Sequence, residues 1–464
     1  MAKSETSKKD EQRQLTRRAL IKWSVAAGAA LGVSRAKIFD ILEGAGGRGL
    51  AEAASEAATC RSVHVVAGNG GLAWFQLMWP QNDVAAGATS TNQLAWHKPG
   101  MQTLVQGTDN PLTIGPDTPF ATLPAEKQMT GFLCGANETH TRQPQSVVSL
   151  NGNNIFSVAS ALQSSAASVI PIVTIGDVDI GTAPGGARPA NVGDGTGIVG
   201  LFNSAASRMG GLLANSNDAE LYKAHYEAFT QLNRASNRST TRTSYTTAVG
   251  AAGFLGTNLA SQLQIQPADL TRYGIDGNTR SNVLAIANSL IVTVKAFQLG
   301  LTNCVVLPAM DDDPHGAFDQ GDVMVVPAQL KAVFDGFMND LTNTSDSATG
   351  QVLSDDTIIT VHGDTPKDCT NKTGWPDGTP GGTNLVYVYG AGHLMTGWWG
   401  GIDRTAKATG FGPDGKAAAY NGTTEAKIAC ASIAYAIAKR DDRAISNFAN
   451  GTTISGVFGR AKDV

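Results

Sequence analysis

The sequence has no excess of basic residues and few charged residues of either sign. It contains 35 Lys and Arg against 39 Asp and Glu, so its formal net charge at pH 7 is -4, and charged residues make up 16% of the chain. A chain of this charge does not attract polyanions or anionic membrane surfaces through its net field. We therefore expect no nucleic-acid partner.

Cysteine is also scarce. The sequence has five cysteines, and no two of them form a C-x-x-C pair. Zinc-thiolate sites and dithiol redox motifs depend on such pairs, so neither is supported. An odd number of cysteines leaves at least one thiol free or available to another chain. Cys304 lies in an apolar run and is the thiol that we expect to be buried.

Glycine and apolar residues, in contrast, are plentiful. Of the 464 residues, 42% are hydrophobic and 53 are glycine. This composition indicates a globular protein with a sizeable core and many turns, and it argues against a coiled coil or a disordered chain.

Residues 1–58 have the order of parts of an export signal. Arg17 and Arg18 follow a polar leader, a short apolar run covers Trp23 to Ser34, and small residues fill most of Ala51 to Ala58. The apolar run is too short to span a bilayer comfortably, and the order resembles a twin-arginine signal peptide. The alternative is an exposed basic start to an ordinary helix. The resemblance implies that the twin-arginine translocase exports a prokaryotic protein to the periplasm or beyond, with no transmembrane segment in the mature chain.

Apolar runs of strand length alternate with longer runs of helix length after residue 58. Such alternation predicts an α/β fold with a doubly wound, mostly parallel sheet flanked by helices. We expect one domain over residues 59–464, with loop insertions at 81–130 and 176–197. The expected strands are 62–67, 169–175, 304–307, 357–361 and 385–389, and the expected helices are 154–163, 218–233, 281–300, 323–341 and 426–439.

Polar side chains directly follow two of the expected strands. Residues 304–307 lead into the run DDDPH at 311–315, and residues 357–361 lead into HGD at 362–364. Ligands bind in the crevice outside the carboxyl ends of parallel strands, so two neighbouring strands that end in acids and histidines predict a divalent-metal site. The alternative is that these acids cap turns or helices while the histidines form local hydrogen bonds.

Hydroxyl, imidazole and guanidinium groups gather in a loop expected at residues 131–144. Thr139 and Thr141 flank His140, and Arg142 follows. A threonine hydroxyl beside an imidazole can act as a nucleophile, and an arginine can bind an anion. A polar loop collects such residues by chance about as often, so the cluster is not a catalytic motif by itself.

Two other runs are candidates for ligand contact. Gly68 to Gly71 follows the first expected strand and predicts a tight turn that allows close backbone approach, although its spacing does not match a dinucleotide or phosphate-binding loop. After the strand at 385–389 come His393 and then Trp398 and Trp399 between glycines. The tryptophans can stack on a substrate, although such a pair more often packs on the core.

The order of these motifs resembles the DUF1501 family, an exported group in the alkaline phosphatase and sulfatase superfamily. The likeness covers most of residues 59–464. The run VVLPAMDDDPHGAFDQ looks like the family's strand leading into G-x-D-T-H, which matches Asp313 and His315. The run DDTIITVHGDTPKD looks like its strand leading into S-E-F-G-R, which matches Asp364 to the acid and Lys367 to the arginine. Thr139 occupies the place of the superfamily's nucleophile.

The resemblance implies an alkaline phosphatase-like fold and a metal held by Asp313, His315 and Asp364, but two expected ligands are missing. Gly70 aligns with an acid of the family, and its D-H-G motif is absent from residues 374–384. Other side chains are open as substitutes, namely His362 and His393 for the missing histidine, and Asp311 or Asp312 for Asp313.

Two hypotheses follow from the sequence. The first is a metal-assisted hydrolase of phosphate or sulfate esters, small or polymeric, which uses zinc, manganese or calcium. In it Thr139 or Thr141, beside His140, supplies the attacking hydroxyl, while Arg142 or Lys367 holds the anion. The second is a non-catalytic exported binding or surface protein on the same fold, with the glycine-rich loops and tryptophans as its recognition face.

Overall fold

The chain divides into a larger and a smaller compact unit. The larger unit holds residues 55–166, 170–195 and 265–464, and the smaller unit holds residues 1–54, 167–169 and 196–264. The single domain expected for residues 59–464 stays a prediction. The computed structural model describes residues 59–68, 73–81, 103–104, 110–138, 140–166, 168–202, 259–311, 313, 325–347, 349–363, 368, 377, 379–403 and 405–449.

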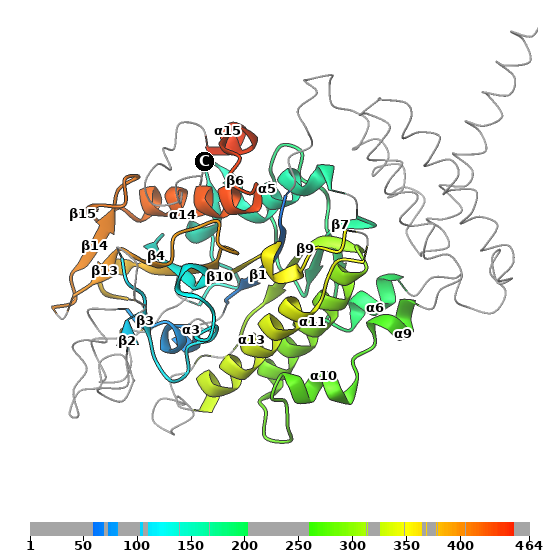
Figure 1. Ribbon diagram of the computed structural model, residues 1–464. Helices are drawn as coiled ribbons and strands as arrows, with labels where there is room; N and C mark the ends of the chain where they lie inside the picture. Colours follow the sequence, from blue (N-terminus) through cyan, green and yellow to red (C-terminus); the bar gives the residue numbers. More distant parts are fainter. Residues whose placement is uncertain are drawn as a thin grey trace, which may run out of the picture. The chain divides into compact units, whose positions relative to one another are not determined.

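An eight-stranded mixed sheet forms the centre of the larger unit (Figure 1). One strand, β11, pairs antiparallel with both of its neighbours, and every other neighbouring pair in the sheet is parallel. The predicted α/β class with a mostly parallel sheet is therefore confirmed. In sheet order the strands are β12 (Gly397–Trp399), β4 (Met129–Cys134), β11 (Asn384–Tyr389), β10 (Thr357–His362), β1 (Arg61–Val66), β9 (Thr302–Pro308), β7 (Ile170–Ile175) and β8 (Ala190–Val192).

Helices cover both faces of this sheet, as expected for central strands that are buried throughout (Figure 1). One face carries α5 (Ile155–Leu162) and α14 (Gly422–Ile437), with α15 (Asp442–Ala449) packed on α14. The other face carries α3 (Ala73–Met78), α11 (Ser281–Gln298) and α13 (Val325–Asn343), and α10 (Pro267–Arg272) precedes α11. Side-chain caps set two of the starts, because Asn154 accepts from Phe156 N and Asn421 from Thr424 N.

Aromatic side chains fill the space between the sheet and α3 with α13. The Trp79 ring lies 4.8 Å from the Tyr387 ring, and the Phe120 ring lies 5.7 Å from that of Tyr389. Phe334 of α13 meets both Trp79 and Phe120 edge to face. Complete burial of one such side chain contributes roughly 1.5–3 kcal/mol, so this layer is a main source of stability for the face.

Shorter elements complete the described chain. A small antiparallel sheet joins β13 (Gly401–Ile402), β14 (Ala408–Phe411) and β15 (Ala417–Ala419), and two hairpin-like pairs join β2 (Thr103–Leu104) with β3 (Thr113–Ile114) and β5 (Ser149–Leu150) with β6 (Asn153–Asn154). Single 3-10 turns cover Ala125–Lys127, Ser146–Val148, Gln163–Ser165, Leu353–Asp355 and Pro380–Gly382. The smaller unit contains α6 (Gly197–Phe202) and α9 (Leu259–Leu263).

Most expected elements are present, with two differences that matter for the site. The strands expected at 304–307 and 357–361 are β9 and β10, but β1 lies between them, so they are not neighbours. The start of the segment expected to be a loop, residues 131–134, belongs to β4, a fully buried strand. The helix expected at 218–233 and the export signal at 1–58 lie outside the described residues.

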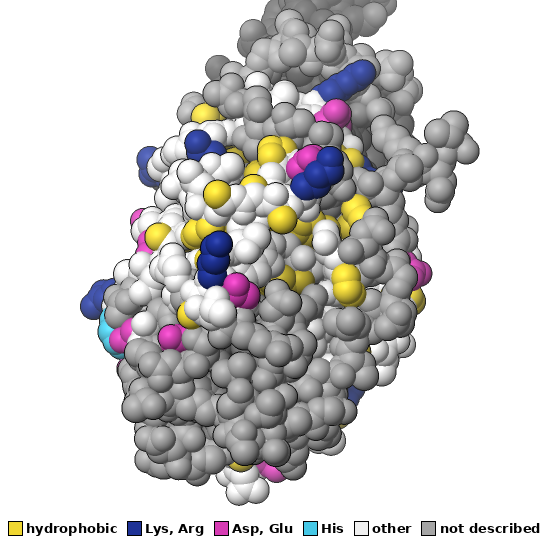
Figure 2. All heavy atoms as spheres, turned by 90° about the vertical axis from the view of Figure 1, so that its left-hand side faces the viewer, with side chains coloured by type: hydrophobic (Ala, Val, Ile, Leu, Met, Phe, Trp, Pro, Cys, Tyr) yellow, Lys and Arg dark blue, Asp and Glu magenta, His cyan; other side chains and the backbone are white. Residues whose placement is uncertain are grey.

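The surface of the described residues is evenly mixed. Among them Val325 is the one large apolar side chain counted as exposed. On the face in Figure 2, lysine and arginine side chains lie apart from one another among acidic and uncharged groups. No helix in this part of the chain is long and apolar enough to cross a membrane.

A network of buried ion pairs lies at the amino-end edge of the sheet, where β1 and β10 begin. The Arg61 guanidinium at the start of β1 pairs with Asp346 and, at 2.8 Å, with Asp356. Lys439 Nζ lies 2.6 Å from the other oxygen of Asp356. Each charge in this region therefore has an opposite partner, as buried charges require.

Two buried histidines lie side by side on β1 and β10. His64 Nδ1 and His362 Nε2 lie 2.7 Å and 2.9 Å from the Thr360 hydroxyl oxygen, and both rings pack on Phe156. Burial lowers the pKa of His362 to about 4, and burial with the neighbouring His362 holds the pKa of His64 well below its usual range. Both imidazoles are therefore neutral inside the folded protein at neutral pH.

This histidine pair predicts a loss of stability in mild acid. Because the pKa of both groups is lower in the folded than in the unfolded chain, only the unfolded chain takes up these protons as the pH falls below ~6.5. The free energy of unfolding should fall between pH ~6.5 and ~4, by about 3 kcal/mol for His362 alone. Urea unfolding across this range measures it. His362→Gln should flatten the slope, and an equal slope in His362→Gln and the parent would contradict the prediction.

Candidate metal centre

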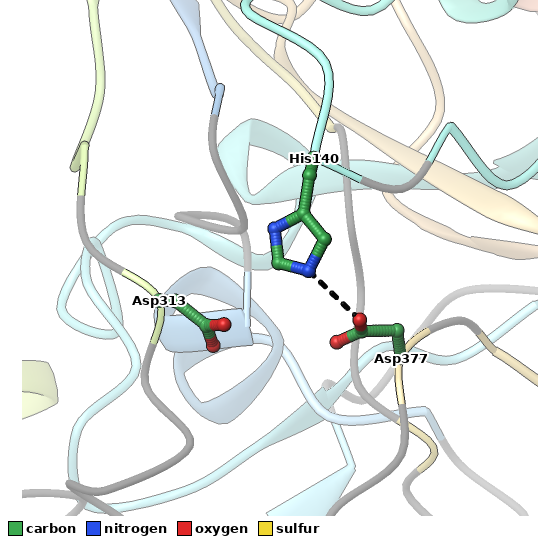
Figure 3. Close-up of side chains that lie close together, drawn as sticks. All are labelled: His140, Asp313 and Asp377. Atoms are coloured by element: carbon green, nitrogen blue, oxygen red, sulfur yellow. Dashed lines mark hydrogen bonds and ion pairs between the residues drawn. The ribbon is translucent and has the colours of Figure 1, made fainter.

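Three side chains with metal-binding atoms meet at one point in the larger unit: His140, Asp313 and Asp377. One ligand atom from each lies within 4.8 Å of the other two (Figure 3). His140 Nε2 lies 2.9 Å from Asp377 Oδ2, so these two already form a hydrogen-bonded ion pair when the ring is protonated. The cluster thus offers one imidazole nitrogen and two carboxylates to a common ion.

All three residues come from the same edge of the sheet. His140 follows the carboxyl end of β4, and Asp313 follows the carboxyl end of β9. Asp377 precedes the amino end of β11, which lies at this edge because β11 runs opposite to the other strands. The site therefore lies where parallel strands of α/β sheets present their ligands, as the sequence predicted.

One backbone and one side-chain hydrogen bond join the segments that carry His140 and Asp377. Asn137 N donates to Gly382 O at 2.9 Å, and Asn384 Nδ2 donates to Ala136 O at 3.2 Å. These bonds join the segment after β4 to the segment before β11. Asp377 and His140 are consequently held near each other by the main chain and by their own contact.

The turn after β1 packs against the His140 segment. A Cβ added to Gly68 would lie 2.3 Å from the carbonyl oxygen of Arg142, far closer than real Cβ contacts come. The predicted close backbone approach at Gly68 is therefore present, but the described contact is with the chain itself. Gly71 and Gly70 lie outside the described residues.

The cluster is open to solvent. The exposed fraction of the side chain is 47% for His140 and 25% for Asp377. His140 has φ of +54°, a left-handed conformation that a residue with a Cβ adopts at a cost of roughly 1–2 kcal/mol. A strained backbone conformation persists only when the surrounding structure holds it. Contacts around His140 therefore fix its backbone and, through it, the direction of its side chain.

The donor atoms fit a divalent ion by type and by spacing. Imidazole suits zinc and its transition-metal neighbours, while carboxylates suit manganese, magnesium and calcium. Ligand bonds of ~2.0–2.2 Å in a tetrahedral zinc site place donor atoms ~3.4 Å apart. Six-coordinate ions with bonds of ~2.3–2.6 Å span up to ~5 Å, which is closer to the 4.8 Å limit of the cluster.

Several predicted site residues cannot be compared with this cluster, since they lie outside the described residues. They are Thr139, His315, Asp364 and Lys367, together with Asp312. Asp313 is thus the one residue of the predicted trio that the structure describes, and it does lie in a cluster of two aspartates and a histidine. Asp311 is exposed just before it.

Thr141 and Arg142 follow His140 directly. The Thr141 hydroxyl donates to Glu138 O at 3.3 Å, which anchors it within its own turn. Arg142 is exposed, while its carbonyl packs on Gly68. Both residues thus lie within two positions of His140 in the sequence.

His362 and His393 lie elsewhere. The His362 ring is enclosed between Thr360 and the carbonyl of Val147, which lies 3.2 Å from Nδ1. His393 follows the carboxyl end of the reversed strand β11 and so lies at the opposite edge of the sheet from His140. Burial there, with the cations Arg440 and Lys439 nearby, lowers the pKa of His393 to about 4. Neither side chain substitutes for a missing ligand of the cluster.

The tryptophan pair belongs to the core. Trp398 and Trp399 form β12, and their exposed fractions are 6% and 2%. The Trp398 ring packs on Tyr387, and the Trp399 ring packs on Phe132. The expectation that they pack inward is confirmed, so they do not form a recognition face.

The four described cysteines are all buried free thiols, and Cys304 is among them as expected.

Asp377 is the member of the cluster that the sequence did not reveal. It lies in the run WPDGTPGG, which lacks the histidine that the family motif would supply. A run rich in proline and glycine directly before an apolar strand does not indicate whether that strand runs parallel or antiparallel to its neighbours. Without that reversal Asp377 would be assigned to the wrong edge of the sheet.

No family model, no curated protein and no solved structure matches the chain.

The close packing of Gly68 predicts a linked loss of stability and of metal affinity. Gly68→Ala must displace the Arg142 carbonyl, and overpacking of this kind costs about 1–3 kcal/mol. We expect a lower free energy of unfolding in urea and weaker Mn²⁺ binding by calorimetry. Gly193→Ala is the control, because a Cβ there meets nothing within 4 Å. A Gly68→Ala protein as stable as the Gly193→Ala protein would refute the prediction.

Proposed function

We propose that the chain is an exported, metal-assisted hydrolase of phosphate or sulfate esters, related to the DUF1501 family and built on an alkaline phosphatase-like fold. The observation that carries the proposal is the meeting of His140, Asp313 and Asp377 at the carboxyl-end edge of the sheet. The three residues come from segments that are far apart in sequence, and each offers a donor atom to the same point. Asp313 also belongs to the motif that carries the family resemblance.

The residues would divide the work as follows. His140, Asp313 and Asp377 would hold a divalent ion, and His315 and Asp364 would add to them. When bound, such an ion acts as a Lewis acid that lowers the pKa of a nearby hydroxyl and stabilises negative charge on an ester oxygen. We propose zinc, manganese or calcium as the ion, since imidazole suits zinc and carboxylates suit manganese and calcium.

The protein's own groups would bind and attack the ester. Thr139 or Thr141 would supply the nucleophilic oxygen, and the Thr141 hydroxyl would exchange its hydrogen bond to Glu138 O, which is 3.3 Å long, for the reaction. Arg142 and Lys367 would hold the anionic oxygens, a task for which the exposed guanidinium of Arg142 is suited. The exposed cluster would admit a polymeric ester as well as a small one.

The cellular setting is part of the proposal. Residues 1–58 would act as the twin-arginine signal, and the mature protein would reside in the periplasm or outside the cell. Export in the folded state through the twin-arginine translocase would suit a protein that acquires its metal first.

A second candidate is a non-catalytic binding protein on the same fold. The hydrogen bond between His140 and Asp377 favours it, because the two side chains satisfy each other without an ion. Its recognition surface would consist of the loops at the carboxyl-end edge, since the tryptophans are buried.

Metal analysis of the folded protein tests the proposal. We expect about one Mn²⁺ or Zn²⁺ per chain, with affinity reduced by on the order of 100-fold or more in Asp313→Asn and Asp377→Asn, a loss at least as large as that from an outer-shell partner. The matched control is Asp177→Asn, which alters an exposed aspartate just beyond the carboxyl end of β7, outside the cluster. Calorimetry and elemental analysis measure both quantities.

Activity separates the two candidates. The metal-loaded protein should release the chromophore from aryl phosphates or aryl sulfates, and the two cluster variants should lose this activity while Asp177→Asn keeps it. A protein that binds metal but leaves both ester classes intact would support the binding protein instead. A protein that binds no divalent ion would rule out the hydrolase.

A further inference from the structure

The carboxylate of Glu138 closes the loop that carries His140. Its oxygens accept hydrogen bonds from Gln145 N at 2.8 and 3.0 Å and from Ser146 N at 3.1 Å. The Ser146 hydroxyl lies 2.8 Å from Oε2, and Ala136 N donates to that hydroxyl oxygen at 2.9 Å. One charged side chain thus joins the beginning of the segment 138–146 to its end.

His140 lies inside the segment that Glu138 closes. Its left-handed φ of +54° is unfavourable for a histidine, so surrounding bonds must hold it. Besides Glu138, Gln143 contributes, because Asp179 N donates to Gln143 Oε1 at 2.7 Å and the Gln143 amide donates back to Asp179 O. Glu138 is the charged member of these anchors and the nearest to His140 in sequence.

Glu138 is not itself part of the ligand cluster. Both of its oxygens are engaged by the main chain of Gln145 and Ser146, and the group of potential ligands consists of His140, Asp313 and Asp377. The geometry points to Glu138 as a positioning residue that holds the His140 imidazole toward Asp377 and Asp313. Its role in metal binding rests on the proposed function, whereas its hold on His140 does not.

A double-mutant cycle read by NMR tests this without any metal. With ¹³C-labelled histidine, the His140 ring signal is assigned by its absence in His140→Gln. Asp377→Asn should move this signal, because it replaces the carboxylate next to Nε2 by a neutral amide. In the Glu138→Ala background the same substitution should move it by about half as much or less, since coupled residues are not additive. If Glu138 only stabilised the fold, Asp377→Asn would move the His140 signal by the same amount with and without Glu138.

The control is Glu126→Ala, which removes an exposed glutamate just before β4. It should leave the response of His140 intact. Glu138→Gln keeps one acceptor oxygen and should restore part of the response, and Ser146→Ala should weaken it less than Glu138→Ala. If Glu138→Ala does not fold, these two variants carry the same measurement.

Metal titration then separates this inference from the proposed function. Glu138→Ala should weaken Mn²⁺ binding by ~10- to 100-fold, as loss of a residue that orients a ligand does, and Glu126→Ala should not. If the parent protein binds no metal but the NMR coupling depends on Glu138, the hydrolase proposal fails and the positioning role stands. If Asp377→Asn leaves the His140 signal unmoved, or moves it equally with and without Glu138, the positioning role is overturned.

Discussion

The candidate site depends on the reversal of one strand. β1, β4, β9 and β10 all present their carboxyl ends at one edge of the sheet, and β11 alone among their neighbours presents its amino end there. That reversal brings the segment containing Asp377 alongside the segment containing His140. Backbone hydrogen bonds between the strands fix the relative positions of the segments that carry the three side chains. Their proximity therefore follows from the sheet and does not depend on independent surface loops.

The two edges of the sheet have different chemistry. At the amino-end edge, buried Arg61 is enclosed by Asp346 and Asp356, and Lys439 completes the charge balance. At the carboxyl-end edge the histidine and the carboxylates are accessible, and one histidine holds a strained conformation. The buried charges at one edge neutralise one another in the interior, whereas the accessible groups at the other edge offer donor atoms that an ion from solution can reach.

Periodicity and composition were sufficient to predict the α/β class, most strands and the edge that carries the site, because buried parallel strands read as short apolar runs with polar residues after them. That pattern predicted the acidic run 311–313, and the family resemblance selected Asp313 within it. The neighbours of each strand were not predictable, since β1 is inserted between β9 and β10 from far away in the sequence. Because strand neighbours and directions could not be predicted, Asp377 was not identified, and the residues of β4 were interpreted as part of a loop. His362 looked like a ligand because a buried, locally bonded histidine at a strand end has the same sequence pattern.

The position of β4 has a consequence for how the protein is made. Its two neighbours in the sheet, β11 and β12, begin at Asn384 and Gly397, about 250 residues further along the chain. During synthesis β4 therefore emerges long before either partner and stays an apolar segment with unpaired edges until they appear. The cluster of His140, Asp313 and Asp377 can therefore assemble only after the segment around β11 has left the ribosome, about 240 residues after His140.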